Sequence, residues 1–250
     1  MNFSDFVLKD KKNLKKRIFF HSDLTYSQLY NFVYNSNFRK DLKYKSNLIA
    51  ICLENPAEFI QIYFSIIQSR NTAIILEKGM PKRKFLKLLK KFNINQVITD
   101  DIVQLSELKN NELFRMNLIN LNNKNVSSFT KIKKRKVSQT KSKDVSTVLF
   151  TSGTTGEKKG VMLTHDNLIS NTSSVLKVLP IKKSDIVNLF LPNSYSFGLS
   201  ILHTHLKKGS SFFFHNSPFV GSIIQELERY KCTVFYGVPS TFEILLNKTN

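Results

Sequence analysis

Short apolar runs alternate along the chain with stretches in which apolar residues recur every three or four positions. The first pattern is typical of buried strands, and the second of helices that cover one face of a sheet. In the N-terminal half, the runs predict strands at 48–53, 72–76 and 96–99, with helices between them at 56–69 and 81–92. This order of β-α-β units predicts a parallel sheet covered by helices.

The same alternation returns in the C-terminal half. Strands are expected at 145–150, 161–163, 186–191, 211–215 and 232–236, and helices at 165–179, 197–206, 220–230 and from Pro239 onward. Between the halves, residues 122–143 are polar and have no clear period, which predicts a surface connection. We therefore expect an α/β fold of largely parallel sheets, with a first subdomain at 1–121, a Lys-rich linker at 122–143 and a second α/β region at 144–250.

The composition allows a sizeable core but gives the chain a large positive charge. Of 250 residues, 41% are hydrophobic, and 38 Lys and Arg against 18 Asp and Glu give a formal net charge of +20. Such a charge attracts nucleic acid, anionic lipid or a phosphate-rich ligand. The basic residues cluster at 9–17, 82–91 and 131–143, which indicates solvated helix faces and a linker. Because no zinc-ligand spacing or RNA-binding aromatic motif accompanies them, we predict no nucleic-acid partner.

The cysteines and the start of the chain indicate a cytoplasmic protein. Cys52 and Cys232 each lie in an apolar run, where free buried thiols are expected. The first residues lead into a charged stretch rather than an apolar signal sequence. No run approaches the roughly 18 apolar residues of a membrane span, so we expect no integral membrane segment.

The most informative stretch, 148–161, reads VLFTSGTTGEKKGV. An apolar strand leads into glycines and hydroxyl residues, followed by two lysines. Glycines let backbone N–H groups approach a bulky anion, hydroxyl groups add donors, and a lysine supplies positive charge for phosphate oxygens. It is not a Walker A loop, because Gly153 and Gly156 are too close together and Glu157 follows the second. The dinucleotide-binding pattern G-x-G-x-x-G is also absent. The stretch therefore predicts a different kind of phosphate-binding loop.

This stretch resembles the phosphate-binding core motif of the adenylate-forming superfamily, which includes acyl- and aryl-CoA ligases, peptide-synthetase adenylation domains and luciferases. In that family the loop closes on the β- and γ-phosphates of ATP. The residues that match the motif are Thr151, Ser152, Gly153, Thr154, Thr155, Gly156 and Lys159. The resemblance implies that these residues bind the ATP phosphates. Lys158 departs from the pattern, because the family usually has proline there.

Two later segments are similar to the acyl pocket of the same family. Residues 191–198, with the sequence LPNSYSFG, lie at the spacing of the pocket motif, and 237–242, GVPSTF, resemble a turn that borders the pocket. The resemblance assigns the pocket to Tyr195, Gly198, Gly237, Val238 and Pro239. Many acyl-CoA ligases have histidine at the position of Tyr195, and ordinary core packing is an equal alternative for this tyrosine. The first segment contains no acid to bind an ammonium group, which favours a fatty or aryl acid over an amino acid.

Weaker features support or limit this reading. Residues 24–29 resemble the opening of a family helix, whereas 68–71 lack the family's usual Lys-Ala-Gly. His165 follows the phosphate loop and is a candidate for a supporting role. His203 and His205 are two positions apart in an expected helix and do not share a face, so we predict no metal site there. No catalytic residue is assigned within this chain.

The resemblance implies that ATP activates a carboxylic acid as an acyl-adenylate, which then passes its acyl group to a thiol of coenzyme A or a carrier protein. Family members are much longer. Their later half carries the adenine and ribose contacts, an acidic ligand for Mg²⁺ and a small domain with a catalytic lysine. We therefore expect an incomplete chain: a fragment, a truncated product, or one half of an enzyme that a second polypeptide completes. The alternative is a non-catalytic remnant that keeps the fold and its phosphate affinity.

Overall fold

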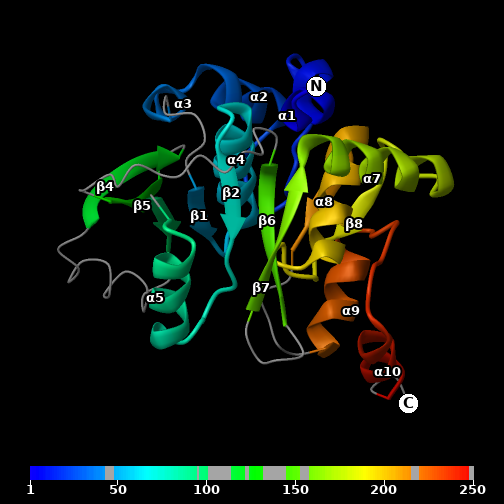
Figure 1. Cartoon of the computed structure of the whole chain (residues 1–250). Helices are drawn as coiled ribbons and strands as arrows, with labels where there is room; N and C mark the ends of the chain where they lie inside the picture. Colours follow the sequence, from blue (N-terminus) through cyan, green and yellow to red (C-terminus); the bar gives the residue numbers. More distant parts are fainter. Residues whose placement is uncertain are drawn as a thin grey trace. The chain divides into compact units, whose positions relative to one another are not determined.

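The structure, a computed structural model, describes residues 1–42, 48–94, 96–100, 114–121, 124–131, 145–152, 158–214 and 220–247 (Figure 1). The chain divides into two compact units. The first unit comprises Met1–Asp5 and Asn31–Leu168, and the second comprises Phe6–Tyr30 and Ile169–Asn250. Each unit contains its own sheet and helices, so each is described by itself.

A seven-stranded sheet in the order β4-β5-β3-β1-β2-β6-β7 forms the centre of the first unit. Its strands are β1 (Leu48–Cys52), β2 (Thr72–Ile75), β3 (Gln96–Thr99), β4 (Phe114–Leu121), β5 (Lys124–Lys131), β6 (Val145–Ser152) and β7 (Lys158–Thr164). The central strands β3, β1, β2 and β6 run parallel, whereas β5 and β7 pair antiparallel with their inner neighbours. This mainly parallel α/β sheet confirms the predicted fold class.

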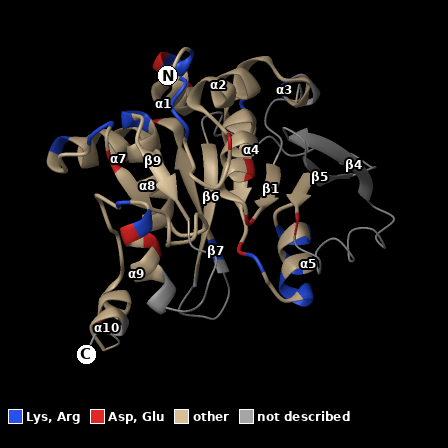
Figure 2. Ribbon diagram, turned by 180° about the vertical axis from the view of Figure 1, so that it is seen from behind, with Lys and Arg blue, Asp and Glu red and all other residues tan. Residues whose placement is uncertain are grey.

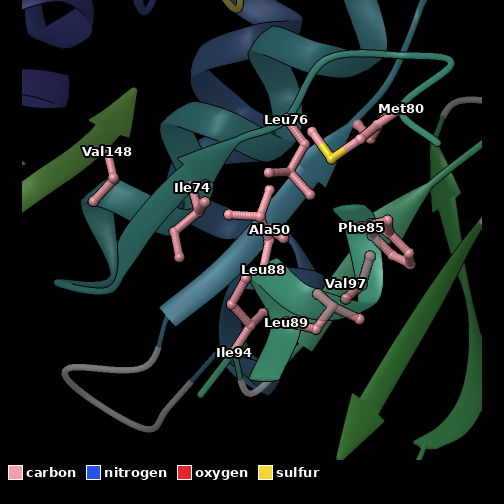
Figure 3. Close-up of a cluster of buried hydrophobic side chains, with 11 residues drawn as sticks. Ala50, Ile74, Leu76, Met80, Phe85, Leu88, Leu89, Ile94, Val97 and Val148 are labelled. Carbon is pink, nitrogen blue, oxygen red and sulfur yellow. The ribbon is translucent and has the colours of Figure 1, made fainter. Parts of the chain in front are cut away.

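Two crossover helices make the parallel pairing possible. Helix α4 (Pro56–Gln68) connects β1 to β2, and α5 (Lys82–Lys91) connects β2 to β3. The side chain of Asn55 caps α4 by accepting the backbone N–H groups of Ala57 and Glu58, and Pro56 occupies the first position, where a missing N–H costs nothing. A cluster of buried side chains joins α5 to the sheet (Figure 3), and includes Ala50, Ile74, Leu76, Met80, Phe85, Leu88, Leu89, Ile94, Val97 and Val148.

Within 122–143, where an irregular connection was expected, the structure has a strand, β5, at Lys124–Lys131. Strand β5 pairs antiparallel with β3 on one side and with β4 on the other. Its sequence, KNVSSFTK, has only Val126 and Phe129 as apolar residues, so its pattern predicts no strand. Pairing with neighbouring strands overrides this weak local preference. Residues 122–123 and 132–143 lie outside the described residues, and the predicted domain division at 121 and 144 stays a prediction.

The second unit is built on a small parallel sheet. Strand β8 (Ile186–Asn188) pairs with β9 (Ser211–Phe213). Single bridges add Phe19 beside Phe212 and Val234 beside Val187. The strand expected at 232–236 is thus reduced to one bridge, because the side chain of Asn188 binds the backbone of Tyr236 in place of further strand pairing.

The remaining helices lie at both ends of the chain. They are α1 (Phe3–Leu8), η1 (Lys9–Lys11), α2 (Tyr26–Asn35), α3 (Asn37–Asp41), α7 (His165–Val178), α8 (Ser196–Lys208), α9 (Val220–Arg229) and α10 (Pro239–Asn247). Within the described residues, no helix has the length and apolar character needed to cross a membrane. Cys52 is buried, Cys232 is half-buried, and both are free thiols. Partial burial raises the pKa of the Cys232 thiol.

Candidate functional site

The described part of the predicted phosphate site lies at one end of the β6–β7 hairpin. In this antiparallel pair, Thr151 faces Lys159 across the ladder, and Ser152 faces Lys158. Side chains that face each other in an antiparallel pair have Cβ atoms about 4.5–5.5 Å apart and point to the same side of the sheet. The side chains of Thr151 and Lys159 are both exposed. A hydroxyl donor and an ammonium group therefore stand side by side, where one anion can contact both.

The structure places only part of the predicted loop. Thr151 and Lys159 are described in full, and Ser152 is described through its backbone pairing. The other predicted phosphate ligands, Gly153, Thr154, Thr155 and Gly156, lie outside the described residues. Their role stays a prediction that rests on the motif.

The hairpin is anchored on its inner side by strand β2 and helix α4. The hydroxyl of Tyr63 on α4 lies 3.0 Å from the hydroxyl of Thr147 on β6, and both side chains are fully buried. Burial raises the pKa of Tyr63 well above its usual value, so the phenol stays protonated and can serve as a hydrogen-bond donor. Thr72 on β2 also donates its hydroxyl to the carbonyl of Val145, at 2.9 Å. These bonds fix β6 against α4 and β2, and the backbone ladder with β7 sets Thr151 opposite Lys159.

His165 lies at the opposite end of the hairpin from Thr151 and Lys159. Its neighbour Thr164 pairs with Val145, at the start of β6. Five residues of extended strand between Lys159 and Thr164 span about 17 Å. The Nδ1 atom of His165 accepts the backbone N–H of Phe3 at 3.1 Å. The geometry therefore gives His165 an anchoring role for the start of the chain, remote from Thr151 and Lys159.

The first predicted pocket segment, 191–198, folds over the start of α8. Tyr195 precedes α8 and donates its backbone N–H to the carbonyl oxygen of Pro192, at 3.0 Å. Its side chain is 53% exposed, so it is not a core residue. A Cβ atom at Gly198 would lie 2.4 Å from the Pro192 oxygen and 2.6 Å from that of Leu191. Only glycine allows this backbone to approach the helix so closely.

The second predicted segment, 237–242, follows Tyr236, whose backbone makes two hydrogen bonds with one side chain. Asn188 is buried and accepts the N–H of Tyr236 through Oδ1 at 2.9 Å, while its Nδ2 donates to the Tyr236 carbonyl at 3.3 Å. Gly237 follows, and a Cβ atom there would lie 3.1 Å from the Cβ of Thr241. Val238 is partly exposed and Pro239 begins α10. The segment from Tyr236 onward is therefore positioned by one side chain of β8.

Aromatic contacts join the two pocket segments. The rings of Phe197 and Tyr236 meet edge to face at 6.1 Å between centroids, and His205 packs on Tyr236 at 5.5 Å. The sequence reasoning assigned no pocket role to Phe197 or Tyr236. The available indication was their position, since each directly precedes one of the predicted glycines, Gly198 and Gly237. The structure thus brings the two segments together through two rings that the list of predicted pocket residues did not include.

Buried histidines near this region are structural. His205 lies with Nδ1 3.0 Å from the carbonyl of Ile201, and burial lowers its pKa. Burial also lowers the pKa of His203, to about 3, so this ring is neutral at pH 7. No cluster of three or more His, Cys, Asp or Glu side chains suited to a metal ion occurs among the residues that the structure describes.

Residues 9–250 match the family model described as AMP-binding enzyme. This chain belongs to the AMP-binding enzyme family. Among known proteins it is similar to the acyl-CoA ligase sidI of Aspergillus fumigatus, with 33% identity over 108 residues, which are 42% of this chain and 18% of that protein. It is also similar to fatty acyl-CoA synthetase B of Dictyostelium discoideum, with 32% identity over 106 residues, 42% of this chain and 15% of that protein.

Solved structures share the fold of this chain. The o-succinylbenzoate CoA synthetase (MenE) of Bacillus subtilis, in complex with the acyl-adenylate OSB-AMP, superposes with a TM-score of 0.71 at 20% identity. That match covers 98% of this chain and 64% of the synthetase chain. ATP-bound MatB of Rhodopseudomonas palustris gives a TM-score of 0.75 at 19% identity, and that match covers 99% of this chain and 51% of the MatB chain. The chain therefore spans less than two thirds of the length of these proteins.

Proposed function

We propose that this AMP-binding enzyme serves the ATP-dependent activation of a carboxylic acid to an acyl-adenylate, followed by acyl transfer to a thiol of coenzyme A or a carrier protein. The observation that carries the proposal is the β6–β7 register, which sets Thr151 beside Lys159 within a family phosphate motif. The similarity to acyl-CoA ligases over 42% of this chain supports the choice of acid and thiol.

The proposed reaction requires positive charge at the leaving group. An oxygen of the substrate carboxylate attacks the α-phosphorus of ATP and forms the acyl-phosphate bond. The bond from that phosphorus to the β-bridging oxygen breaks, and pyrophosphate leaves with the bonding electrons. The Lys159 ammonium and the Thr151 hydroxyl, together with the predicted ligands at 152–156, bind the negative charge that builds up on the leaving group.

The acid is proposed to bind beside the start of α8. Tyr195, Gly198, Gly237, Val238 and Pro239 are the proposed lining, and the exposed rings of Tyr195 and Phe197 add apolar area. No Asp or Glu occurs in 191–198, so the segment offers no partner for a substrate ammonium. These features favour a fatty or aryl acid.

The proposed reaction also needs a Mg²⁺ ligand and contacts to the adenine of ATP. Bound Mg²⁺ would neutralise phosphate charge, and its ligand is proposed to come from outside the described residues. A second polypeptide or a longer product of the same gene is proposed to supply that ligand and the adenine contacts. A cytoplasmic location suits a reaction that consumes ATP, but it too is a proposal.

Carboxylate-dependent exchange of pyrophosphate into ATP tests the proposal. The assay is run on this chain and on the full product of its locus, with a panel of fatty, aryl and amino acids. We expect exchange with fatty or aryl acids that is lost in Lys159→Ala and Thr154→Ala, and kept in Lys177→Ala, which removes an exposed lysine from α7. Absence of exchange with every acid and from both products would contradict the proposal and favour the non-catalytic remnant.

A further inference from the structure

The end of helix α7 exposes a run of apolar residues. Val178, the last residue of the helix, is 80% exposed, Leu179 is 39% exposed, and Pro180 is exposed as well. We call these three residues the apolar tip. Single exposed apolar side chains are ordinary on protein surfaces, but three in succession indicate a surface that a partner covers.

Hydrogen bonds and one buried side chain hold the apolar tip in a turn. The backbone N–H of Leu179 donates to the carbonyl of Val175 at 2.9 Å, which continues the helical pattern beyond Val178. The backbone N–H of Ile181 then donates to the carbonyl of Leu179 at 2.8 Å, and the side chain of Ile181 is buried. The chain is therefore anchored directly after the tip, and the tip itself is presented to solvent.

Three exposed lysines flank the apolar tip in the sequence. Lys177 precedes it, and Lys182 and Lys183 follow it. Figure 2 shows basic residues in blue at this end of α7. Five Cα–Cα steps of about 3.8 Å lead from Val178 to Lys183, so these two residues lie no more than about 19 Å apart. Because a lysine stem can extend its ammonium group along a surface, one partner surface can contact the tip and these lysines together.

A fourth lysine joins this group from the N-terminal part of the same unit. The ammonium group of Lys16 donates to the carbonyl oxygens of Lys183 and, at 3.1 Å, of Gly209. Burial and the neighbouring charge of Lys183 lower the pKa of Lys16, so like charges repel each other here. We call the four lysines the lysine collar: Lys16, Lys177, Lys182 and Lys183.

Local structure does not account for the lysine collar. The helix dipole favours a cation in the last turn of α7, which suits Lys177, but Lys182 and Lys183 lie beyond the helix. Asp185 is buried, and its Oδ2 accepts the backbone N–H of Lys182 at 2.7 Å, which serves the turn. Positive charge is thus gathered around the tip although it repels itself.

The combination of apolar and basic groups narrows the partner. Apolar side chains that enter the boundary between headgroups and acyl chains, together with lysines that contact anionic headgroups, are the two signals of peripheral membrane binding. Nucleic acid would be attracted by the collar, but it has no use for an exposed Val-Leu-Pro run, and neither the tip nor the collar has an aromatic ring to stack on a base.

We propose that the apolar tip and the lysine collar form a docking surface for an anionic lipid bilayer. The chain then lies on the membrane surface, with the side chains of Val178 and Leu179 among the lipid headgroups and the ammonium groups of the collar on their negative charges. This inference goes beyond the proposed function and does not depend on it, because it uses no residue of the β6–β7 hairpin or of the pocket segments.

Variants matched in charge and in apolar character test the proposal. The net charge of +20 attracts the chain to any anionic surface, so each variant needs a control with the same change elsewhere. The collar variant combines Lys177→Gln, Lys182→Gln and Lys183→Gln, and its control combines Arg83→Gln, Lys84→Gln and Lys90→Gln on the exposed side of α5.

The tip variant combines Val178→Gln and Leu179→Gln. Its control combines Val161→Gln and Met162→Gln on β7, whose side chains are 42% and 63% exposed. Circular dichroism and thermal unfolding check that every variant folds. Binding is measured by co-sedimentation with vesicles of phosphatidylcholine alone and of phosphatidylcholine mixed with phosphatidylserine. This chain and the full product of its locus are both assayed.

At about 0.1 M salt, we expect the unmodified chain to bind the mixed vesicles and the collar variant to bind at least tenfold more weakly, because each lysine near an anionic surface strengthens binding by about fivefold. The tip variant should bind about tenfold more weakly, since its polar side chains no longer favour the headgroup boundary. Both controls should stay within about twofold of the unmodified chain, and about 1 M salt should remove the effect of the collar variant.

Four results would overturn the inference. They are no binding of mixed vesicles by the unmodified chain, equal weakening by each variant and its control, no effect of the tip variant, and no vesicle binding by the full product, which would show that another part of it covers the tip. Binding of duplex DNA that the collar variant weakens, without any vesicle binding, would assign the collar to nucleic acid instead. Each of these outcomes leaves the proposed acid activation intact, because the pyrophosphate exchange assay tests that reaction separately.

Discussion

The β6–β7 hairpin and the two pocket segments position their candidate residues in different ways. In the hairpin, Thr151 and Lys159 are exposed, and their positions follow from the backbone ladder alone. In the pocket segments, the backbone is held by the buried side chain of Asn188 and by close packing over Gly198. A ladder tolerates changes of its exposed side chains, whereas a close approach or a buried clamp does not. We therefore expect changes in the hairpin to affect ligand binding, and changes in the pocket segments to affect folding first.

The largest effect should come from Gly198→Ala. Its new methyl group would overlap the carbonyl oxygens of Leu191 and Pro192, at 2.6 and 2.4 Å, and backbone atoms cannot move aside as a flexible side chain would. We expect a loss of about 3 kcal/mol in the free energy of unfolding, measured in urea by circular dichroism. The control is Gly79→Ala, where φ is +71° and the added Cβ meets open space. That variant should lose only about 1 kcal/mol. Equal losses would show that close packing does not distinguish Gly198.

A smaller effect should follow from removing the clamp in Asn188→Ala. The change leaves the N–H and carbonyl of Tyr236 without their buried partner, which costs about 2 kcal/mol of unfolding free energy. Amide exchange of residues after Tyr236 should become faster, as hydrogen–deuterium exchange can measure. The matched change in the first unit, which contains the β6–β7 hairpin, is Asn167→Ala. The exposed side chain of Asn167 accepts hydrogen bonds from the backbone N–H and the hydroxyl of Thr164 at the start of α7. Its loss should cost about 1 kcal/mol or less.

The free energy of unfolding should depend on pH partly through His203 of the second unit, which contains the two pocket segments. Its pKa is about 3 in the folded chain, where burial disfavours the charged ring, and about 6.5 in the unfolded chain. Below about pH 6.5 the unfolded chain binds a proton that the folded chain excludes, so the free energy of unfolding falls as pH falls. The slope reaches about 1.4 kcal/mol per pH unit, and His205 acts in the same direction.

Urea unfolding at about pH 7 and about pH 5 measures this slope. His203→Leu should lose less stability over the same interval, because it removes one of the groups that gain a proton on unfolding. An identical slope in the variant would show that His203 stays neutral in the unfolded chain or is accessible in the folded one.

The sequence was most informative where local pattern and tertiary structure agree. Helix α5 and strand β1 were predicted from period and apolar runs because their burial follows those patterns. Strand β5 was missed, since its sequence is largely polar and the strand is formed by backbone pairing with β3 and β4. The motif gave Lys159 but not its register with Thr151, which depends on where β7 begins, three residues earlier than the apolar run at 161–163. The clamp at Asn188 has no local pattern, because its partner is distant in sequence.

The smallest effect on stability, and the clearest separation of the two regions, should come from Lys159→Ala. The side chain is exposed, so its removal should change the free energy of unfolding by less than about 0.5 kcal/mol. Binding of tripolyphosphate, measured by calorimetry at low salt, should nevertheless weaken by about tenfold or more, because a charge-assisted contact contributes about 1.5–3 kcal/mol. Lys177→Ala, on α7, should change neither quantity. A loss of stability without a loss of affinity would show that Lys159 supports the hairpin, and the phosphate-binding role would then fall to other residues of the motif.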